Sequence, residues 1–179
     1  MEQAVAVHLA EGFEEIEAVS IIDVLRRAGI DTRVVSVIRK LDVTGSHGIR
    51  ITADRLFEET DYESIGMIVL PGGMPGATHL KEHAGLCGEV LHFHRQGKLL
   101  GAICAAPIDF GHLGILKDRP ATCYPGFENL LTGANVTGAD VETSGNIITG
   151  KGAGVAVRFA LKIVEMLKGK VLADNWLGR

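Results

Sequence analysis

The stretch "KLLGAICAAP", residues 98–107, joins an apolar run to small residues and a proline. The apolar run predicts a buried strand, and Pro107 fits the first turn of a following helix. Two further runs of the same kind are "VAVHLA", residues 5–10, and "MIVL", residues 67–70. Near-continuous apolar strands are typical of a parallel sheet that helices cover on both faces. The stretch therefore favours an α/β fold.

The rest of the chain alternates strands with helices, as βαβ units require. Strands are predicted at 3–10, 31–38, 67–73, 98–103 and 119–126, helices at 14–29, 78–97, 104–112 and 154–169, and hairpins at 41–54 and 139–152. Linkers, repeats and low-complexity segments are missing. We expect one domain over residues 1–179, a three-layer α/β sandwich with a mostly parallel sheet and helices on both faces.

The composition excludes several classes of protein. The net charge is −4 with no basic block, which argues against a nucleic-acid partner. No apolar run reaches the roughly 18 residues of a membrane span, and the start of the chain lacks a basic secretory signal. Three cysteines without a CxxC pair argue against a disulfide framework and a zinc ribbon. We expect a cytoplasmic protein.

Cys104 falls where the strand at 98–103 turns into a helix. A nucleophile elbow holds its side chain on such a turn and needs small neighbours, which Gly101, Ala105 and Ala106 supply. A thiol at a helix N-terminus ionises more readily than a free cysteine. The alternative is an inert buried thiol, since free cysteine is among the most buried residue types.

Two other predicted strands end beside this turn. Gly72 and Gly73 end the strand predicted at 67–73, and their amides, with that of Ala105, could form an oxyanion pocket. A plain tight turn is the alternative for the two glycines. In open α/β sheets, ligands bind outside the carboxyl ends of the strands.

Glu17 heads an apolar stripe with Ile21, Val24 and Ala28 on the first predicted helix. A carboxyl group on that face should be desolvated, which raises its pKa. A protonated carboxyl could then hydrogen-bond to a thiolate. Its neighbours Glu14 and Glu15 are explained by the helix dipole, which favours acids in a first turn.

Together, "AEGFEEIEAV" (10–19), "VLPGGMPGA" (69–77) and "GAICAAP" (101–107) resemble the motifs of the ThiJ/PfpI superfamily, in the branch of the parkinsonism-associated protein deglycase and in its bacterial form. The resemblance covers nearly the whole chain. It implies a flavodoxin-like fold, a homodimer and no cofactor or metal. It assigns the reactive cysteine to Cys104 and its acid partner to Glu17.

The same resemblance assigns the oxyanion amides to Gly72, Gly73 and Ala105. It implies a cysteine-dependent glyoxalase that needs no glutathione, or a deglycase, acting on methylglyoxal, glyoxal or glycated protein and protecting against carbonyl and oxidative stress. The alternative is a redox sensor or chaperone whose cysteine is oxidised to sulfinic acid. An amidase or peptidase is a weaker alternative. Thiazole biosynthesis, a label of some relatives, has no support in these residues.

Two positions depart from the family pattern. Tyr124 stands where the branch's human member has a histidine, so no imidazole matches the usual Cys–His pair. His47 stands where the dimer partner often contributes an arginine. We expect Tyr124, Cys123 and His47 as possible pocket-lining residues.

Two short motifs carry less weight. "HLKEH" (79–83) matches a zinc-binding string but has no second ligand set, so we expect no metal. "GKGAG" (150–154) resembles a phosphate loop without the full Walker spacing.

Overall fold

The computed structural model describes residues 4–175 and contains one central sheet of seven strands. Neighbouring strands in this sheet run parallel, apart from β10, which pairs antiparallel with β11 at one edge. In spatial order the strands are β10 (Val141–Ser144), β11 (Ile147–Gly150), β7 (Leu99–Ile103), β6 (Ile65–Leu70), β1 (Ala4–Leu9), β2 (Thr32–Ser36) and β5 (Arg55–Leu56). The predicted mostly parallel sheet is confirmed.

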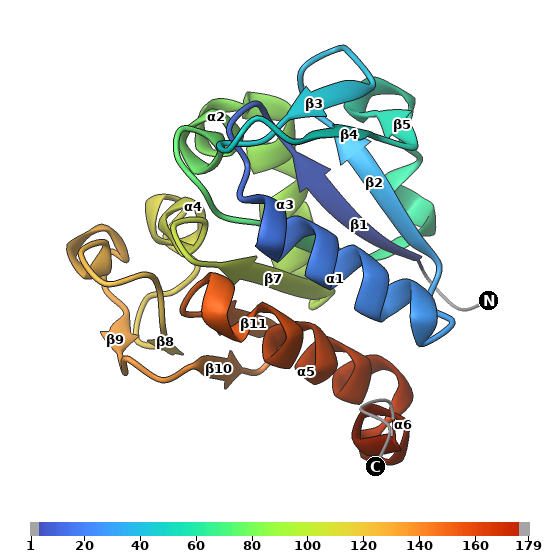
Figure 1. Cartoon of the computed structure of the whole chain (residues 1–179). Coiled ribbons are helices and arrows are strands. Elements are labelled where there is room, and N and C mark those ends of the chain that lie inside the picture. Colours follow the sequence, from blue (N-terminus) through green and yellow to red (C-terminus); the bar gives the residue numbers. More distant parts are fainter. Residues whose placement is uncertain (1–3, 176–179) are drawn as a thin grey trace.

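Helices cover both faces of this sheet, as Figure 1 shows. They are α1 (Glu15–Arg27), α2 (Gly76–Glu82), α3 (Ala84–Gln96), α4 (Pro107–His112), α5 (Ala156–Lys168) and α6 (Lys170–Asn175). Because successive strand residues face opposite sides, Val5 and Val7 of β1 pack in the core with α1 and α5, whereas Ala4 and Ala6 pack in the core with α3 and α4. The three-layer sandwich is therefore confirmed.

Two predicted helices need correction. The helix expected at 78–97 is divided at His83, which adopts an extended conformation and accepts a hydrogen bond from the Leu86 amide at 3.0 Å. This side chain caps α3 and ends α2. The helix expected from Cys104 begins at Pro107, because residues 104–106 form a turn.

Both predicted hairpins are present. The first forms a separate antiparallel pair, β3 (Asp42–Thr44) with β4 (Arg50–Thr52). The second is β10–β11, which joins the central sheet. The strand predicted at 119–126 is shorter: β8 (Pro120–Ala121) pairs only with β9 (Asn135–Val136).

Gln3, the first residue of the first predicted strand, lies outside the described residues. Between residues 4 and 175, none of the helices combines the length and the apolar character that crossing a membrane requires.

Candidate active site

Cys104 occupies a strained turn directly after β7. Its φ is +65°, a left-handed value that is uncommon for residues other than glycine. Its amide donates to the Gly150 carbonyl at 2.9 Å, and its carbonyl accepts from the Tyr124 amide at 2.8 Å. The main chain is thus fixed from both sides, and the half-buried thiol projects from the carboxyl end of the sheet. The predicted elbow is present.

Glu17 reaches this thiol from α1. Its side chain is completely buried, and its Oε2 accepts the Gly72 amide at 2.7 Å. Its other oxygen, Oε1, is buried without a protein hydrogen-bond partner. The carboxyl and the Cys104 thiol are close enough that each alters the pKa of the other. Glu17 and Cys104 therefore form the pair that the sequence predicted.

The two glycines after β6 allow this close approach. A Cβ at Gly72 would lie 2.5 Å from the Cys104 Cβ and 2.8 Å from Glu17 Oε2. Gly73 has a φ of +90°, and a Cβ there would lie 2.4 Å from the Glu14 amide nitrogen. Only glycine fits at either position without displacing the carboxyl, the thiol or the start of α1.

The predicted oxyanion amides divide into two groups. The Gly72 amide is already bound to Glu17, so its assignment as a free oxyanion donor was wrong. The amides of Gly73 and Ala105 instead donate toward the Cys104 sulfur, where they favour the thiolate. These two donors can also stabilise negative charge that develops on an oxygen atom of a group bonded to that sulfur.

The thiol is less acidic than the sequence predicted. Burial is the largest cause that raises the pKa of Cys104, to about 12, followed by the negative charge of Glu17. The helix dipole does not reverse this, because α4 begins three residues later. Burial also raises the pKa of Glu17 to about 7, as expected, so both of its protonation states are present near neutral pH. When Glu17 is protonated, its charge no longer opposes ionisation of the thiol.

Glu14 holds the start of α1 in place. Its Oε2 accepts the Glu17 amide at 2.8 Å, which makes it the N-cap of the helix. The helix dipole alone, which explains an acid at this position in the sequence, does not predict this capping role. The spacing of an acid and a glutamate three residues later, as in a capping box, was the available signal.

Tyr124 and Cys123 have different environments. Tyr124 is half exposed and lines a cavity of about 340 Å³ with Lys151 and residues 152–155. Cys123 is buried in the core and is not part of the lining of this cavity, and its predicted place in the crevice beside Cys104 stays a prediction. Burial raises the pKa of the Cys123 thiol to about 11.

His47 lies at the tip of the β3–β4 hairpin and pairs with Glu15. Its Nδ1 lies 2.9 Å from Glu15 Oε2, and its amide donates to Glu15 Oε1 at 2.6 Å. This pairing raises the pKa of His47, and the hydrogen bonds from His47 lower that of Glu15. His47 therefore anchors the hairpin to α1, and within this chain it does not contact the thiol.

Potential metal ligands gather at the same place. Within residues 4–175, one group of three ligand atoms lies close together, from Glu14, Glu15 and His47, all within 4.8 Å of one another. Each of the three residues already uses at least one of these potential metal-ligating atoms in a hydrogen bond within the protein. In the "HLKEH" string, His79 contacts the Glu11 carbonyl and His83 caps α3.

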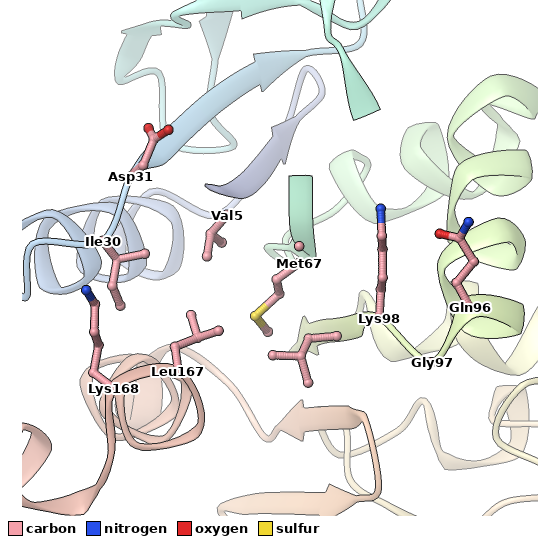
Figure 2. A pocket seen from close by; sticks show the side chains of 11 residues that line it. Val5, Ile30, Asp31, Met67, Gln96, Gly97, Lys98, Leu167 and Lys168 are labelled. Carbon is pink, nitrogen blue, oxygen red and sulfur yellow. The ribbon is translucent and has the colours of Figure 1, made fainter. Parts of the chain in front are cut away.

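A cavity of about 450 Å³ lies at the amino-terminal ends of the central strands, opposite the end that carries Cys104 (Figure 2). It is lined by Val5 and Met67 near the beginnings of β1 and β6, by Lys98 before β7, and by Leu167 near the end of α5. Cys104 follows the carboxyl end of β7, so this cavity is separate from the thiol.

Comparison with known proteins supports the fold and identifies the family. Residues 3–166 match the DJ-1/PfpI family. Protein DJ-1 homolog B of Arabidopsis thaliana is 41% identical over 93% of the chain, which spans only 38% of that relative's length. The glutathione-independent glyoxalase DJR-1.2 of Caenorhabditis elegans is 36% identical over 93% of the chain and 89% of the relative.

A solved structure shows the same architecture. Oxidized DJ-1 of Toxoplasma gondii superposes with a TM-score of 0.94 at 38% identity, covering 98% of this chain and 96% of that one. The sequence match, the shared fold and the cysteine at the strand-to-helix turn lead to one assignment. The chain belongs to the DJ-1/PfpI family.

Proposed function

We propose that the chain is a cysteine-dependent glyoxalase that needs no glutathione and acts on methylglyoxal, glyoxal or their adducts on protein. The observation that carries the proposal is the pair of Cys104 and the fully buried Glu17, held together across Gly72. The name of the Caenorhabditis elegans relative, a glutathione-independent glyoxalase, supports it.

The first step is addition of Cys104 to the aldehyde of methylglyoxal. A bond forms between sulfur and the aldehyde carbon, the carbonyl electron pair moves to oxygen, and the thiol proton passes to Glu17. Glu17 returns this proton to the oxygen, which gives a hemithioacetal. The amides of Gly73 and Ala105 stabilise the transient oxyanion.

The second step is an internal isomerisation that needs no external oxidant. Glu17 removes the proton from the former aldehyde carbon, and the ketone oxygen takes up a proton from water, which gives an enediol. Glu17 then returns its proton to the neighbouring carbon, while the hydroxyl group on the sulfur-bearing carbon loses its proton to water and becomes the carbonyl, so the hemithioacetal becomes a thioester. Water hydrolyses the thioester to lactate and the free thiol. A general base works best with a pKa near the working pH, and the pKa of Glu17 is about 7.

Turnover of methylglyoxal tests the proposal. Lactate formation without glutathione is expected for the wild-type chain, and losses of about 100-fold or more are expected for Cys104→Ser and Glu17→Gln, as for removal of a nucleophile or a general base. Cys123→Ser, a matched change at a buried thiol, should retain turnover. Full activity in Cys104→Ser and Glu17→Gln would exclude this mechanism.

A redox sensor or chaperone is the second candidate. A solved relative, that of Toxoplasma gondii, is described as oxidized, which favours a readily oxidised thiol in the family. Susceptibility to oxidation follows thiolate character, however, and burial and Glu17 oppose ionisation of Cys104. Selective conversion of Cys104 to sulfinic acid by mild peroxide, without methylglyoxal turnover, would favour the sensor. Amidase chemistry is weaker, because among the described residues the groups that act on the Cys104 thiol include no imidazole that could protonate a leaving amine.

The homodimer is part of this proposal. Ile16 and Val19 of α1 and Ile49 of the β3–β4 hairpin are large apolar side chains that are about half exposed. Glu15 ties this hairpin to α1, so a second copy could cover these residues together. Sedimentation of the wild-type chain and of Ile16→Glu tests this: the wild type should sediment as a dimer and the variant as a monomer. A monomeric wild type would exclude the homodimer. A cytoplasmic location stays a prediction.

A further inference from the structure

The cavity lined by Tyr124 has no part in the steps above. Its volume is about 340 Å³, and its other lining residues are Pro125, Lys151 and the segment 152–155. This volume suits a small organic group. The segment overlaps the "GKGAG" motif, which the proposed chemistry leaves unexplained.

Two residues that line the cavity are positioned by main-chain hydrogen bonds of Cys104. Tyr124 donates its amide to the Cys104 carbonyl at 2.8 Å, and Lys151 follows Gly150, whose carbonyl accepts the Cys104 amide at 2.9 Å. Both residues are thus positioned by the same turn that positions the thiol. The cavity therefore lies next to the main chain of the turn that carries the thiol.

The cavity carries one positive charge. The Lys151 amine donates to the Gly138 carbonyl at 3.3 Å, and no carboxylate in the described part of the chain forms an ion pair with it. The nearby Asp140 carboxylate is paired with Arg158. Lys151 is part of the cavity lining, and within residues 4–175 no ion pair with a carboxylate neutralises its charge.

We propose that Lys151 binds an anionic group of the substrate whose aldehyde reacts at Cys104. The preferred substrates are then α-oxoaldehydes that carry a carboxylate or phosphate, and neutral methylglyoxal is a poorer member of the class. This inference rests on the proposed function, because it assumes that Cys104 reacts with carbonyl compounds.

Two alkylating reagents separate charge recognition from thiol reactivity. Bromopyruvate and bromoacetone both present a bromomethyl ketone, and the thiolate displaces bromide from either, but only bromopyruvate carries a carboxylate. The rate constant for alkylation of Cys104 is measured for each reagent by peptide mass spectrometry. The ratio of the two rate constants, anionic over neutral, cancels changes in the thiol itself.

The variants are Lys151→Met, Lys151→Arg and the matched control Lys162→Met, whose lysine pairs with Glu165 on α5. We expect the ratio to fall about fivefold in Lys151→Met, the effect of one unit charge at about 4 Å in water. Lys151→Arg and Lys162→Met should keep the wild-type ratio. Added salt should lower the ratio in the wild type but not in Lys151→Met.

Each outcome decides the inference. An equal ratio in wild type and Lys151→Met, with Cys104 still alkylated, overturns the role of Lys151 and leaves the proposed function intact. An equal fall in Lys162→Met also overturns it, because the effect would then be general. Failure of Cys104 to react with either reagent overturns both the inference and the proposed function.

Discussion

The amide of Gly72 donates a hydrogen bond of 2.7 Å to Oε2 of Glu17, which ties the loop after β6 to helix α1. The bond holds the Glu17 side chain at the carboxyl end of the sheet, where it is coupled to the thiol of Cys104. The other carboxylate oxygen, Oε1, is buried without a protein hydrogen-bond partner. A backbone amide that the sequence suggested for substrate thus holds the carboxyl group of Glu17 instead.

Gly72→Ala tests this geometry. The added Cβ would lie 2.5 Å from the Cys104 Cβ, so the thiol or the carboxyl must move. We expect a loss of about 1–3 kcal/mol in the free energy of unfolding, as for overpacking of a core, together with at least about tenfold slower methylglyoxal turnover. Urea denaturation and lactate formation measure the two effects.

Gly88→Ala is the matched control for that substitution. Gly88 lies inside α3, and a Cβ there would meet nothing within 4 Å. Alanine should stabilise the helix by about 0.5–1 kcal/mol and leave turnover unchanged. Equal effects of the two substitutions would contradict the close contact at Gly72.

Asp109→Asn tests a buried acid on α4. Asp109 is 3% exposed, both of its carboxylate oxygens lack a protein partner, and burial raises its pKa well above the usual value. The stability that protonated Asp109 contributes is fully present below about pH 3.9, the pKa of an aspartate in the unfolded chain. It declines as the pH rises above that value and is lost once the pH passes the raised pKa of Asp109 in the folded protein. The variant should therefore gain stability relative to wild type between pH 4 and pH 9.

Urea midpoints across that pH range measure the gain. Asp118→Asn, at an exposed aspartate, is the control and should reproduce the wild-type pH dependence. A wild-type stability that rises from pH 4 to pH 9 in parallel with that of Asp109→Asn would show that Asp109 is not a buried protonated acid.

Glu15→Ala tests the anchor of the β3–β4 hairpin. Glu15 accepts the amides of His47 at 2.6 Å and Ile49 at 3.4 Å. Its removal leaves these amides unpaired, so their hydrogen exchange should accelerate and stability should fall by about 1–3 kcal/mol. His47→Ala keeps both amide bonds and should preserve their protection. Unchanged exchange in Glu15→Ala would mean that the hairpin does not depend on this carboxylate.

Local sequence patterns predicted the features of this protein that depend on neighbouring residues. Apolar runs marked the strands, and small residues around Cys104 marked the turn. The break at His83 was missed because it depends on a side chain that caps the Leu86 amide, which helical periodicity does not reveal.

Contacts between distant segments were less accessible to prediction. The stripe below Glu17 predicted its burial, but only the fold shows that the Gly72 amide binds its carboxylate. The low pKa expected for Cys104 was based on the helix N-terminus alone. Burial of the thiol and the negative charge of Glu17, which raise this pKa, depend on the fold. Lys151 had a weak phosphate-loop pattern, and its position beside Cys104 follows only from the pairing of β11 with β7.

The ionisation of Glu17 and that of Cys104 are coupled. The most direct test of this coupling is the rate of alkylation of Cys104 by iodoacetamide from pH 5 to pH 10, in wild type and in Glu17→Gln. Because ionised Glu17 opposes ionisation of the thiol, the wild-type profile should bend near pH 7, where Glu17 titrates, and Glu17→Gln should lack that bend. Identical profiles in the two proteins would contradict the account.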